Sequence, residues 1–180
     1  MHSDQDFSLR KYMGRNETPA LVADPGSHAA RVLVAEDSPA SAMGLRVALD
    51  AEGCHVTVVP NGEDALDEVM SCSSPGCQYD IIFMDLFMPV VDGIAATTQI
   101  RAYEEKNGSY TAIVGITCSE FANFPGDDEV ARAQGAGMDT LAVKPVRQEA
   151  IRYYLRAYAY TSGNRMVEAA LKPKSELPPM

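Results

Sequence analysis

Five short apolar runs alternate with five segments of helical length, and this alternation constrains the fold more than any other feature. The runs are RVLVA (31–35), HVTVV (55–59), DIIFM (80–84), AIVGIT (112–117) and TLAV (140–143). Segments of helical length follow at about 39–52, 62–71, 93–106, 127–135 and 146–160. Strands that alternate with helices predict an α/β fold with a parallel sheet. Near-continuous apolar strands indicate that helices cover both faces of that sheet.

Turn and capping residues support these boundaries. Ser38 precedes Pro39, which places a capping hydroxyl before a proline in the first turn of a helix. Asn61 precedes the second helical segment, and Asp92 precedes the third, so both are predicted helix caps. Gly108 is expected to end the third helix.

The chain is predicted to hold one domain, at residues 31–160. A chain of 180 residues with 46% hydrophobic and 22% charged residues is typical of a globular protein with a buried core. Residues 1–30 lack sustained periodicity and are expected to form a flexible arm, and residues 161–180 a C-terminal tail.

The net charge of −10 disfavours direct binding to nucleic acid, because the acidic excess lies within residues 31–160 and repels phosphates. No apolar run approaches the length of about 18 residues that a membrane helix needs. The first residues lack the apolar segment of a secretory signal. We therefore expect a cytoplasmic protein, with a nuclear address left open.

Four cysteines are expected to be reduced thiols. Cys54, Cys72, Cys77 and Cys118 lack the spacing of a zinc site. Disulfide frameworks are rare in the intracellular compartments that the sequence favours.

Polar side chains lie at the ends of four of the five predicted strands. Glu36 and Asp37 follow the first, Asp85 the third and Lys144 the fifth, and Thr117 is the last residue of the fourth. Parallel strands present their carboxyl ends at one edge of the sheet, where ligands bind. Acidic residues also cap helices in such loops, so Glu36 and Asp37 alone do not decide between a cap and a site.

If they converge, these residues fit a phosphoryl-transfer site. Three carboxylates in a small volume repel one another, and Mg²⁺ would relieve this because it prefers oxygen ligands and leaves room for a phosphate oxygen. Lys144 and Thr117 supply a positive charge and a hydroxyl, which suit an anion. Asp85, on the central strand, is the best placed nucleophile for an acyl phosphate.

Several strings in this order resemble the receiver domain of two-component response regulators, most closely those of hybrid sensor histidine kinases. They are VLVAEDSP, YDIIFMDLFMPVVDG, IVGIT and AQGAGMDTLAVKPV, and the resemblance covers about residues 30–160. It implies a flavodoxin-like (βα)5 fold, a doubly wound sheet in strand order 2-1-3-4-5. It also implies a regulatory phosphoacceptor that assists its own phosphorylation and dephosphorylation, rather than a metabolic enzyme.

The resemblance assigns roles by position. It makes Asp85 the phosphate acceptor, Thr117 the switch hydroxyl and Lys144 the partner of the phosphoryl group. Mg²⁺ would be held by Glu36, Asp37, Asp85 and the backbone carbonyl of Phe87. The Lys144–Pro145 bond would be cis. The phosphoryl donor would be a histidine kinase or a histidine phosphotransfer protein.

Three positions depart from the family pattern. Leu141 stands where many receivers carry an aromatic residue that rotates with the switch, so aromatic-coupled signalling is not expected. Cys118 replaces a small residue beside Thr117. Phe87 lies two residues after Asp85, beside the path of attacking water, which leads to the hypothesis that it slows hydrolysis of the acyl phosphate.

The first helix is a candidate docking surface for the phosphotransfer protein. Gly44, Leu45, Ala48 and Leu49 suit an inward face, whereas Met43 and Val47 share a more exposed one. Scattered apolar residues on a surface are also common without a partner. A homodimer is left open.

Two other functions compete with the phosphoacceptor. A Mg²⁺-dependent phosphatase with an aspartyl nucleophile would need a second acid two residues after Asp85, and that position is Phe87. A scaffold that keeps the fold without phosphorylation is disfavoured because all five expected polar positions are present.

Overall fold

The computed structural model describes residues 29–72, 76–118 and 128–159. Residues 1–28 of the expected arm, Tyr160 and the tail 161–180 lie outside this part of the chain. The elements are β1 (Arg31–Ala35), α2 (Pro39–Asp50), β2 (His55–Val59), α3 (Gly62–Ser71), β3 (Ile81–Asp85), α4 (Gly93–Asn107), β4 (Ala112–Cys118), α5 (Asp128–Ala136), β5 (Thr140–Lys144), α6 (Gln148–Tyr154) and the π-helical turn η1 (Leu155–Ala159).

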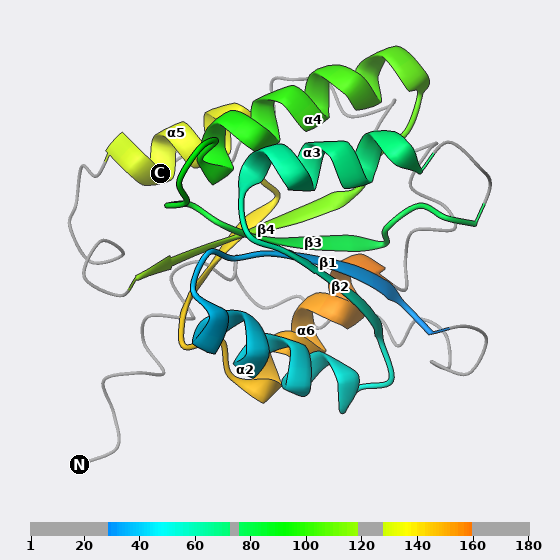
Figure 1. The fold of residues 1–180 in the computed structure, drawn as a ribbon, viewed down its shortest axis with the longest axis vertical. Coiled ribbons are helices and arrows are strands. Elements are labelled where there is room, and N and C mark those ends of the chain that lie inside the picture. Colours follow the sequence, from blue (N-terminus) through cyan, green and yellow to red (C-terminus); the bar gives the residue numbers. More distant parts are fainter. Residues whose placement is uncertain (1–28, 73–75, 119–127, 160–180) are drawn as a thin grey trace.

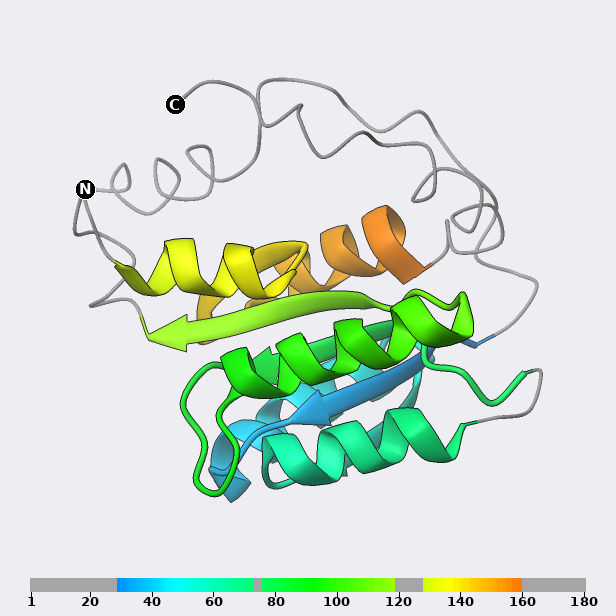
Figure 2. The ribbon, with the colours of Figure 1, turned by 90° about the horizontal axis from the view of Figure 1, so that it is seen from above.

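The strands form one parallel sheet in the order β2-β1-β3-β4-β5. Helices α3, α4 and α5 cover one face of the sheet, and α2 and α6 cover the other (Figures 1 and 2). The predicted doubly wound fold and its strand order are therefore confirmed. The order places β3 at the centre of the sheet, with the ends of β1 and β4 on either side of it.

Alternating side chains of the strands divide the core into two layers. Val32 and Val34 face the layer of α2 and α6, where Leu49 and Ile151 are also buried. Leu33 faces the layer of α3, α4 and α5. Strands whose side chains are buried on both faces account for the continuous apolar runs in the sequence.

Several observed boundaries differ from the expected ones by a residue or two, and three differences are described here. Strand β3 includes Asp85, so the carboxylate is the last residue of a strand rather than the first of a loop. The last helix is shorter than expected and changes to π-helical geometry at Leu155. Ala30, placed in the arm by sequence, is 1% exposed, and its carbonyl accepts a hydrogen bond from the His55 backbone. Ala30 therefore packs with the sheet.

Helix starts follow the predicted caps. The Ser38 hydroxyl accepts from the backbone of the first turn of α2, and Asn61 and Asp92 cap α3 and α4 in the same way. Gly108 ends α4 at a φ of 64°, in the left-handed region that glycine favours. In the described part of the chain, every helix is too short or too polar to cross a bilayer.

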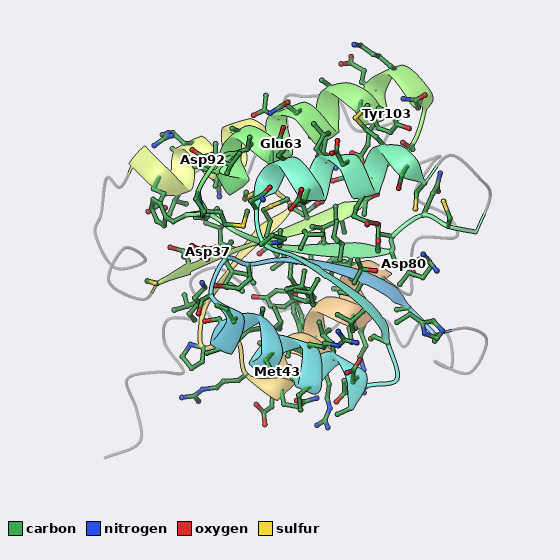
Figure 3. The ribbon with its side chains drawn as sticks, in the orientation of Figure 1. Asp37, Met43, Glu63, Asp80, Asp92 and Tyr103 are labelled. Atoms are coloured by element: carbon green, nitrogen blue, oxygen red, sulfur yellow. The ribbon has the colours of Figure 1, made fainter. Side chains whose placement is uncertain are left out.

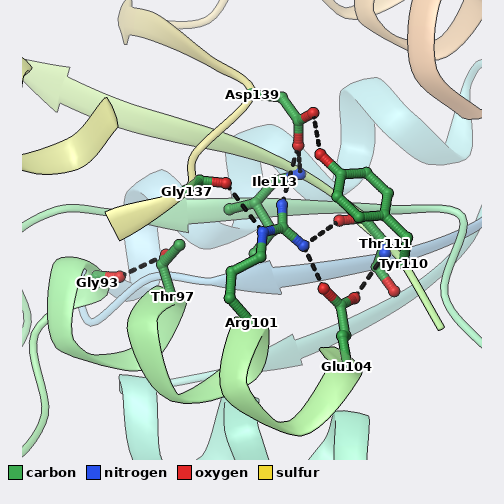
Figure 4. A network of polar contacts seen from close by, with 9 residues as sticks. All are labelled: Gly93, Thr97, Arg101, Glu104, Tyr110, Thr111, Ile113, Gly137 and Asp139. Atoms are coloured by element: carbon green, nitrogen blue, oxygen red, sulfur yellow. Dashed lines mark hydrogen bonds and ion pairs between the residues drawn. The ribbon is translucent and has the colours of Figure 1, made fainter. Parts of the chain in front are cut away.

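A polar network holds the amino-terminal edge of the sheet together (Figure 4). Arg101, on α4, donates to the carbonyl oxygens of Gly137 and Thr111, at 2.9 Å each. Its guanidinium also pairs with Asp139 at 3.0 Å and with Glu104. Because Thr111 precedes β4 and Asp139 precedes β5, one side chain links α4 to the starts of two strands.

Candidate functional site

The residues expected to form the site come together at the carboxyl edge of the sheet. Glu36 and Asp37 follow β1, Asp85 ends β3, and Lys144 ends β5. Figure 3 shows Asp37 at the same end of the sheet as Asp92, the cap of α4, whereas Asp80 lies at the opposite end. Residues far apart in the sequence thus meet because parallel strands end at one edge.

Three carboxylates form a cluster at this edge. Glu36, Asp37 and Asp85 each offer an oxygen within 4.8 Å of the others. Glu36 and Asp85 are both 4% exposed, whereas Asp37 is exposed to solvent. Buried carboxylates are costly without counter-charge, and oxygen donors in this number suit a hard divalent cation such as Mg²⁺. The cluster therefore fits the ion that the sequence predicted.

Lys144 supplies counter-charge to two of these carboxylates. Its Nζ lies 2.6 Å from Oδ2 of Asp85 and 2.7 Å from Oε2 of Glu36. Burial lowers the pKa of Lys144, but its hydrogen bonds to Asp85 and Glu36 outweigh burial and hold that pKa above the usual range. Burial raises the pKa of Glu36, and the hydrogen bond from Lys144 opposes this shift. One cation is shared between two buried anions, so the site retains an excess of negative charge.

The Thr117 hydroxyl lies buried at the same edge without a partner. Asp85 is paired in register with Ile116 on β4, and Thr117 is the next residue along that strand. Thr117 is 3% exposed, and its Oγ1 has no hydrogen-bond partner among the described residues. Buried hydroxyls are normally satisfied, so an orphaned one indicates a place where a further polar group belongs.

The loop after Asp85 is held close to that residue. Oδ1 of Asp85 accepts from the backbone N–H of Phe87 at 3.1 Å. The Gly93 N–H donates to the carbonyl of Leu86 at 3.1 Å. A Cβ at Gly93 would lie 2.0 Å from the Asp85 carbonyl oxygen, so this position excludes every side chain. The close approach explains why glycine follows the cap Asp92.

Two features of this region were not predicted from the sequence. Lys144 bridges Glu36 as well as Asp85, and no spacing in the sequence signals that second contact. Val90 has a φ of 68° and is 76% exposed. A β-branched residue in the left-handed region carries backbone strain. The sequence Pro89-Val90-Val91 did not predict this strained conformation, because valine favours extended backbone.

These observations favour a receiver, and a comparison with known families decides the matter. The family described as the response regulator receiver domain matches residues 32–156. The chain belongs to this family. The matched residues begin within β1 and end within the π-helical turn.

One relative of this receiver is the hybrid signal transduction histidine kinase L of Dictyostelium discoideum. The two are 31% identical over 148 residues, which cover 82% of this chain and 8% of the kinase. The sensor protein GacS of Pseudomonas syringae is 34% identical over 146 residues, covering 78% of this chain and 15% of that protein. The receiver thus spans a small part of the curated relatives that it matches.

Solved receiver structures share the fold. The receiver domain of the sensor histidine kinase PA1611 from Pseudomonas aeruginosa, with a magnesium ion in its active-site cleft, has a TM-score of 0.60 and 28% identity, covering 73% of this chain and 98% of that one. The receiver domain of Ssk1 from Saccharomyces cerevisiae, in complex with the histidine phosphotransfer protein Ypd1, has a TM-score of 0.62 and 27% identity, covering 73% and 89%.

The positions that depart from the family pattern are found in and around the site. Leu141 is half-buried and packs over Gly115, where a Cβ would lie 2.5 Å from the leucine side chain. Cys118 is exposed at the end of β4, in register with Lys144. The Phe87 side chain is 53% exposed. The Lys144–Pro145 bond is cis, the form that the resemblance implied.

The expected docking helix presents its apolar pair to solvent. Met43 and Val47 are each 60% exposed and lie one turn apart on α2. Leu45 and Leu49 are buried, as the sequence suggested. Gly44 is exposed rather than inward-facing, because the buried stripe of α2 is narrower than the sequence indicated.

Proposed function

We propose that this receiver accepts a phosphoryl group on Asp85 from the phosphohistidine of a histidine kinase or a histidine phosphotransfer protein. The observation that carries the proposal is the pairing of Asp85 with Lys144 next to the orphaned Thr117 hydroxyl. A nucleophilic carboxylate, a fixed cation and a free hydroxyl donor are the groups that a transferred phosphoryl needs.

In this reaction an Asp85 oxygen forms a bond to phosphorus as the bond from phosphorus to the histidine nitrogen breaks. The nitrogen keeps the electron pair. Lys144 and Thr117 then contact the phosphoryl oxygens, which gives the Thr117 hydroxyl a partner. This exchange of contacts is a local charge event of the kind that biases a two-state element, and we assign Thr117 the role of switch hydroxyl on that basis.

We further propose that Glu36, Asp37, Asp85 and the Phe87 carbonyl hold Mg²⁺. The ion would neutralise part of the charge on the phosphoryl oxygens and on the carboxylates. The excess negative charge of the cluster, with one lysine between two buried carboxylates, supports this assignment.

Intact mass after incubation with Mg²⁺ and a small acyl-phosphate donor tests the phosphoacceptor. The wild-type chain should gain one phosphoryl group, and Asp85→Asn should gain none. Asp92→Asn is the matched control, because Asp92 is an aspartate at the same edge that only caps α4. Equal mass gain in Asp85→Asn and in the wild type would rule the proposal out.

For the partner, we propose that Met43 and Val47 contact a histidine phosphotransfer protein. The complex of Ypd1 with the Ssk1 receiver is a precedent for such a partner. Met43→Ala with Val47→Ala should slow phosphoryl transfer from a phosphohistidine protein but not from the small donor. Met70→Ala, at an exposed methionine of the opposite helix layer, is the control. Equal slowing with both donors would show that Met43 and Val47 support the phosphoacceptor site and do not contact the phosphotransfer protein.

An aspartyl phosphatase remains the alternative for the same groups. Phe87 occupies the position where such an enzyme would carry its proton donor, which disfavours turnover. Incubation with a generic phosphoester discriminates, because repeated phosphate release indicates the enzyme and single labelling the receiver. The hypothesis that Phe87 slows hydrolysis fails if Phe87→Asn leaves the phosphoryl half-life unchanged.

The remaining assignments stay predictions. A homodimer, the lack of direct nucleic-acid binding and a cytoplasmic rather than nuclear address rest on the sequence alone. So does the expectation that the receiver assists its own phosphorylation and dephosphorylation without acting as a metabolic enzyme.

A further inference from the structure

Two thiols contact each other at the end of α3, away from the acidic cluster. Cys72 is the C-cap of α3, and Cys77 lies in the segment that leads to β3. Sγ of Cys72 donates a hydrogen bond to the Cys77 carbonyl at 2.8 Å. The Cys72 and Cys77 side chains also share a hydrogen bond. Both cysteines are free and half-buried. We propose that Cys72 and Cys77 are an oxidisable pair that closes to an intramolecular disulfide.

The surroundings allow the small movement that this bond requires. Disulfides need close Cβ atoms in a defined orientation, and two thiols already in contact are near that arrangement. Gly76, next to Cys77, has a φ of 89°, and no atom of the residues that the structure describes lies within 4 Å of where its Cβ would be. The backbone beside Cys77 can therefore adjust without displacing a side chain of the described residues.

A cavity beside the pair gives a small oxidant access to Cys72. It has a volume of about 210 Å³ and is lined by Cys72, Tyr79, Tyr103, Asn107 and four further residues. A water molecule takes up about 30 Å³ in the liquid, so the cavity is large enough for hydrogen peroxide. Peroxide is the oxidant that we assign to this site.

The reaction proceeds in two balanced steps. One of the two cysteine sulfurs attacks a peroxide oxygen, the O–O bond breaks, and the hydroxide that leaves takes up the proton of that thiol as water. The product is a sulfenic acid on that cysteine. The sulfur of the other cysteine then attacks the sulfur of the sulfenic acid, the S–O bond breaks, and a second water forms with the proton of the second thiol.

The other two cysteines serve as internal controls. Cys54 is buried in the opposite core layer, and burial raises its pKa to about 11. Cys118 is exposed at the far end of the sheet, in register with Lys144. A single exposed thiol can form a sulfenic acid but cannot close a disulfide within the chain. The pair also lies away from the acidic cluster, so the proposal does not depend on phosphorylation.

The test treats the full reduced chain with hydrogen peroxide and measures intact mass, followed by alkylation of the remaining thiols and tandem mass spectrometry. We expect a loss of two hydrogens, with Cys72 and Cys77 both protected from alkylation, and recovery on reduction with dithiothreitol. Cys118→Ser should lose the same two hydrogens. Cys72→Ser should instead gain oxygen on Cys77.

The proposal is overturned if peroxide leaves Cys72 and Cys77 open to alkylation, or if Cys72→Ser still loses two hydrogens. The measurement on the unsubstituted chain decides the matter even if a variant fails to fold. Oxidised protein should still accept a phosphoryl group on Asp85, which separates this outcome from that of the phosphoacceptor test.

Discussion

The two edges of the sheet both hold buried charges, but they differ in how completely those charges are satisfied. At the amino-terminal edge, Arg101 faces Glu104 and Asp139 and also donates to two backbone carbonyls. The Tyr110 ring stacks 4.3 Å from the guanidinium. At the carboxyl edge, one lysine serves two buried carboxylates, and a buried hydroxyl has no partner within the described ranges.

This difference separates a structural cluster from a reactive one. A fully bonded network specifies one packing arrangement and leaves little capacity for a ligand. An incompletely bonded cluster is costly to keep and is typical of functional sites. We therefore assign the amino-terminal edge to stability and the carboxyl edge to phosphoryl chemistry. The predictions that follow are ordered from the largest expected effect to the smallest.

Arg101→Met should have the largest effect on stability. It leaves Glu104, which is 2% exposed, without its cation, and breaking a buried pair costs about 3–5 kcal/mol of unfolding free energy. Urea denaturation measures the loss. Arg46→Met is the control, because Arg46 pairs with Asp50 at 3.7 Å on an exposed surface, where a loss below about 1 kcal/mol is expected. Equal losses in the two variants would remove the contrast between the edges.

Mg²⁺ should stabilise the wild-type chain through the carboxyl edge alone. A free Mg²⁺ concentration of 100 times its dissociation constant should raise the free energy of unfolding by about 2.7 kcal/mol. Glu36→Gln should lose most of this gain, whereas Asp139→Asn, a carboxylate change at the other edge, should keep it. Denaturation with and without Mg²⁺ measures the gain within each variant. An equal gain in both variants would mean that the ion binds elsewhere.

Gly93→Ala should disturb the carboxyl edge specifically. Its Cβ would meet the Asp85 carbonyl at 2.0 Å, and overpacking of this kind costs about 1–3 kcal/mol of unfolding free energy. Phosphoryl uptake should fall as well, because the loop after Asp85 must move. At Gly44 on α2, no atom of the described residues lies within 4 Å of the position that a Cβ would take, so Gly44→Ala should stabilise the helix by about 0.5–1 kcal/mol. Normal uptake in Gly93→Ala would contradict the close approach.

The smallest effect concerns the pH dependence of the amino-terminal edge. Burial raises the pKa of Glu104 above its ordinary value of 4.5, although Arg101 opposes the shift. The folded state then holds the proton more tightly, so this contribution to stability is present below pH 4.5 and is lost as the pH rises through the folded pKa. Glu104→Gln should therefore gain stability relative to the wild type as the pH rises. Urea denaturation of both proteins from pH 4 to 7 measures this gain. A difference in unfolding free energy between Glu104→Gln and the wild type that stays constant with pH would contradict the prediction.

Sequence alone predicted the elements and most of the site because both follow from local signals. The alternation of apolar runs and helical segments, together with the helix caps, defined where each strand ends. Once the sheet was taken as parallel, the residues at these ends, Glu36, Asp85, Thr117 and Lys144, were expected at one edge. The resemblance to a family added the strand order, and the comparisons confirm that family.

Other features depend on tertiary contacts that carry no local signal. Arg101 contacts residues 10 and 38 positions away, and the ion pair between Lys144 and Glu36 links the ends of β5 and β1. The strained backbone at Val90 runs against the preference of valine. The contact between Cys72 and Cys77 likewise follows from how the chain returns from α3 to β3.

The most direct test of the central claim is the identity of the phosphorylated residue. Borohydride reduces an aspartyl phosphate to homoserine, so treating the phosphorylated chain with it marks the acceptor permanently. Tandem mass spectrometry should find homoserine at position 85 and aspartate unchanged at position 37. Homoserine at position 37, or at neither position after a confirmed phosphoryl gain, would contradict the account.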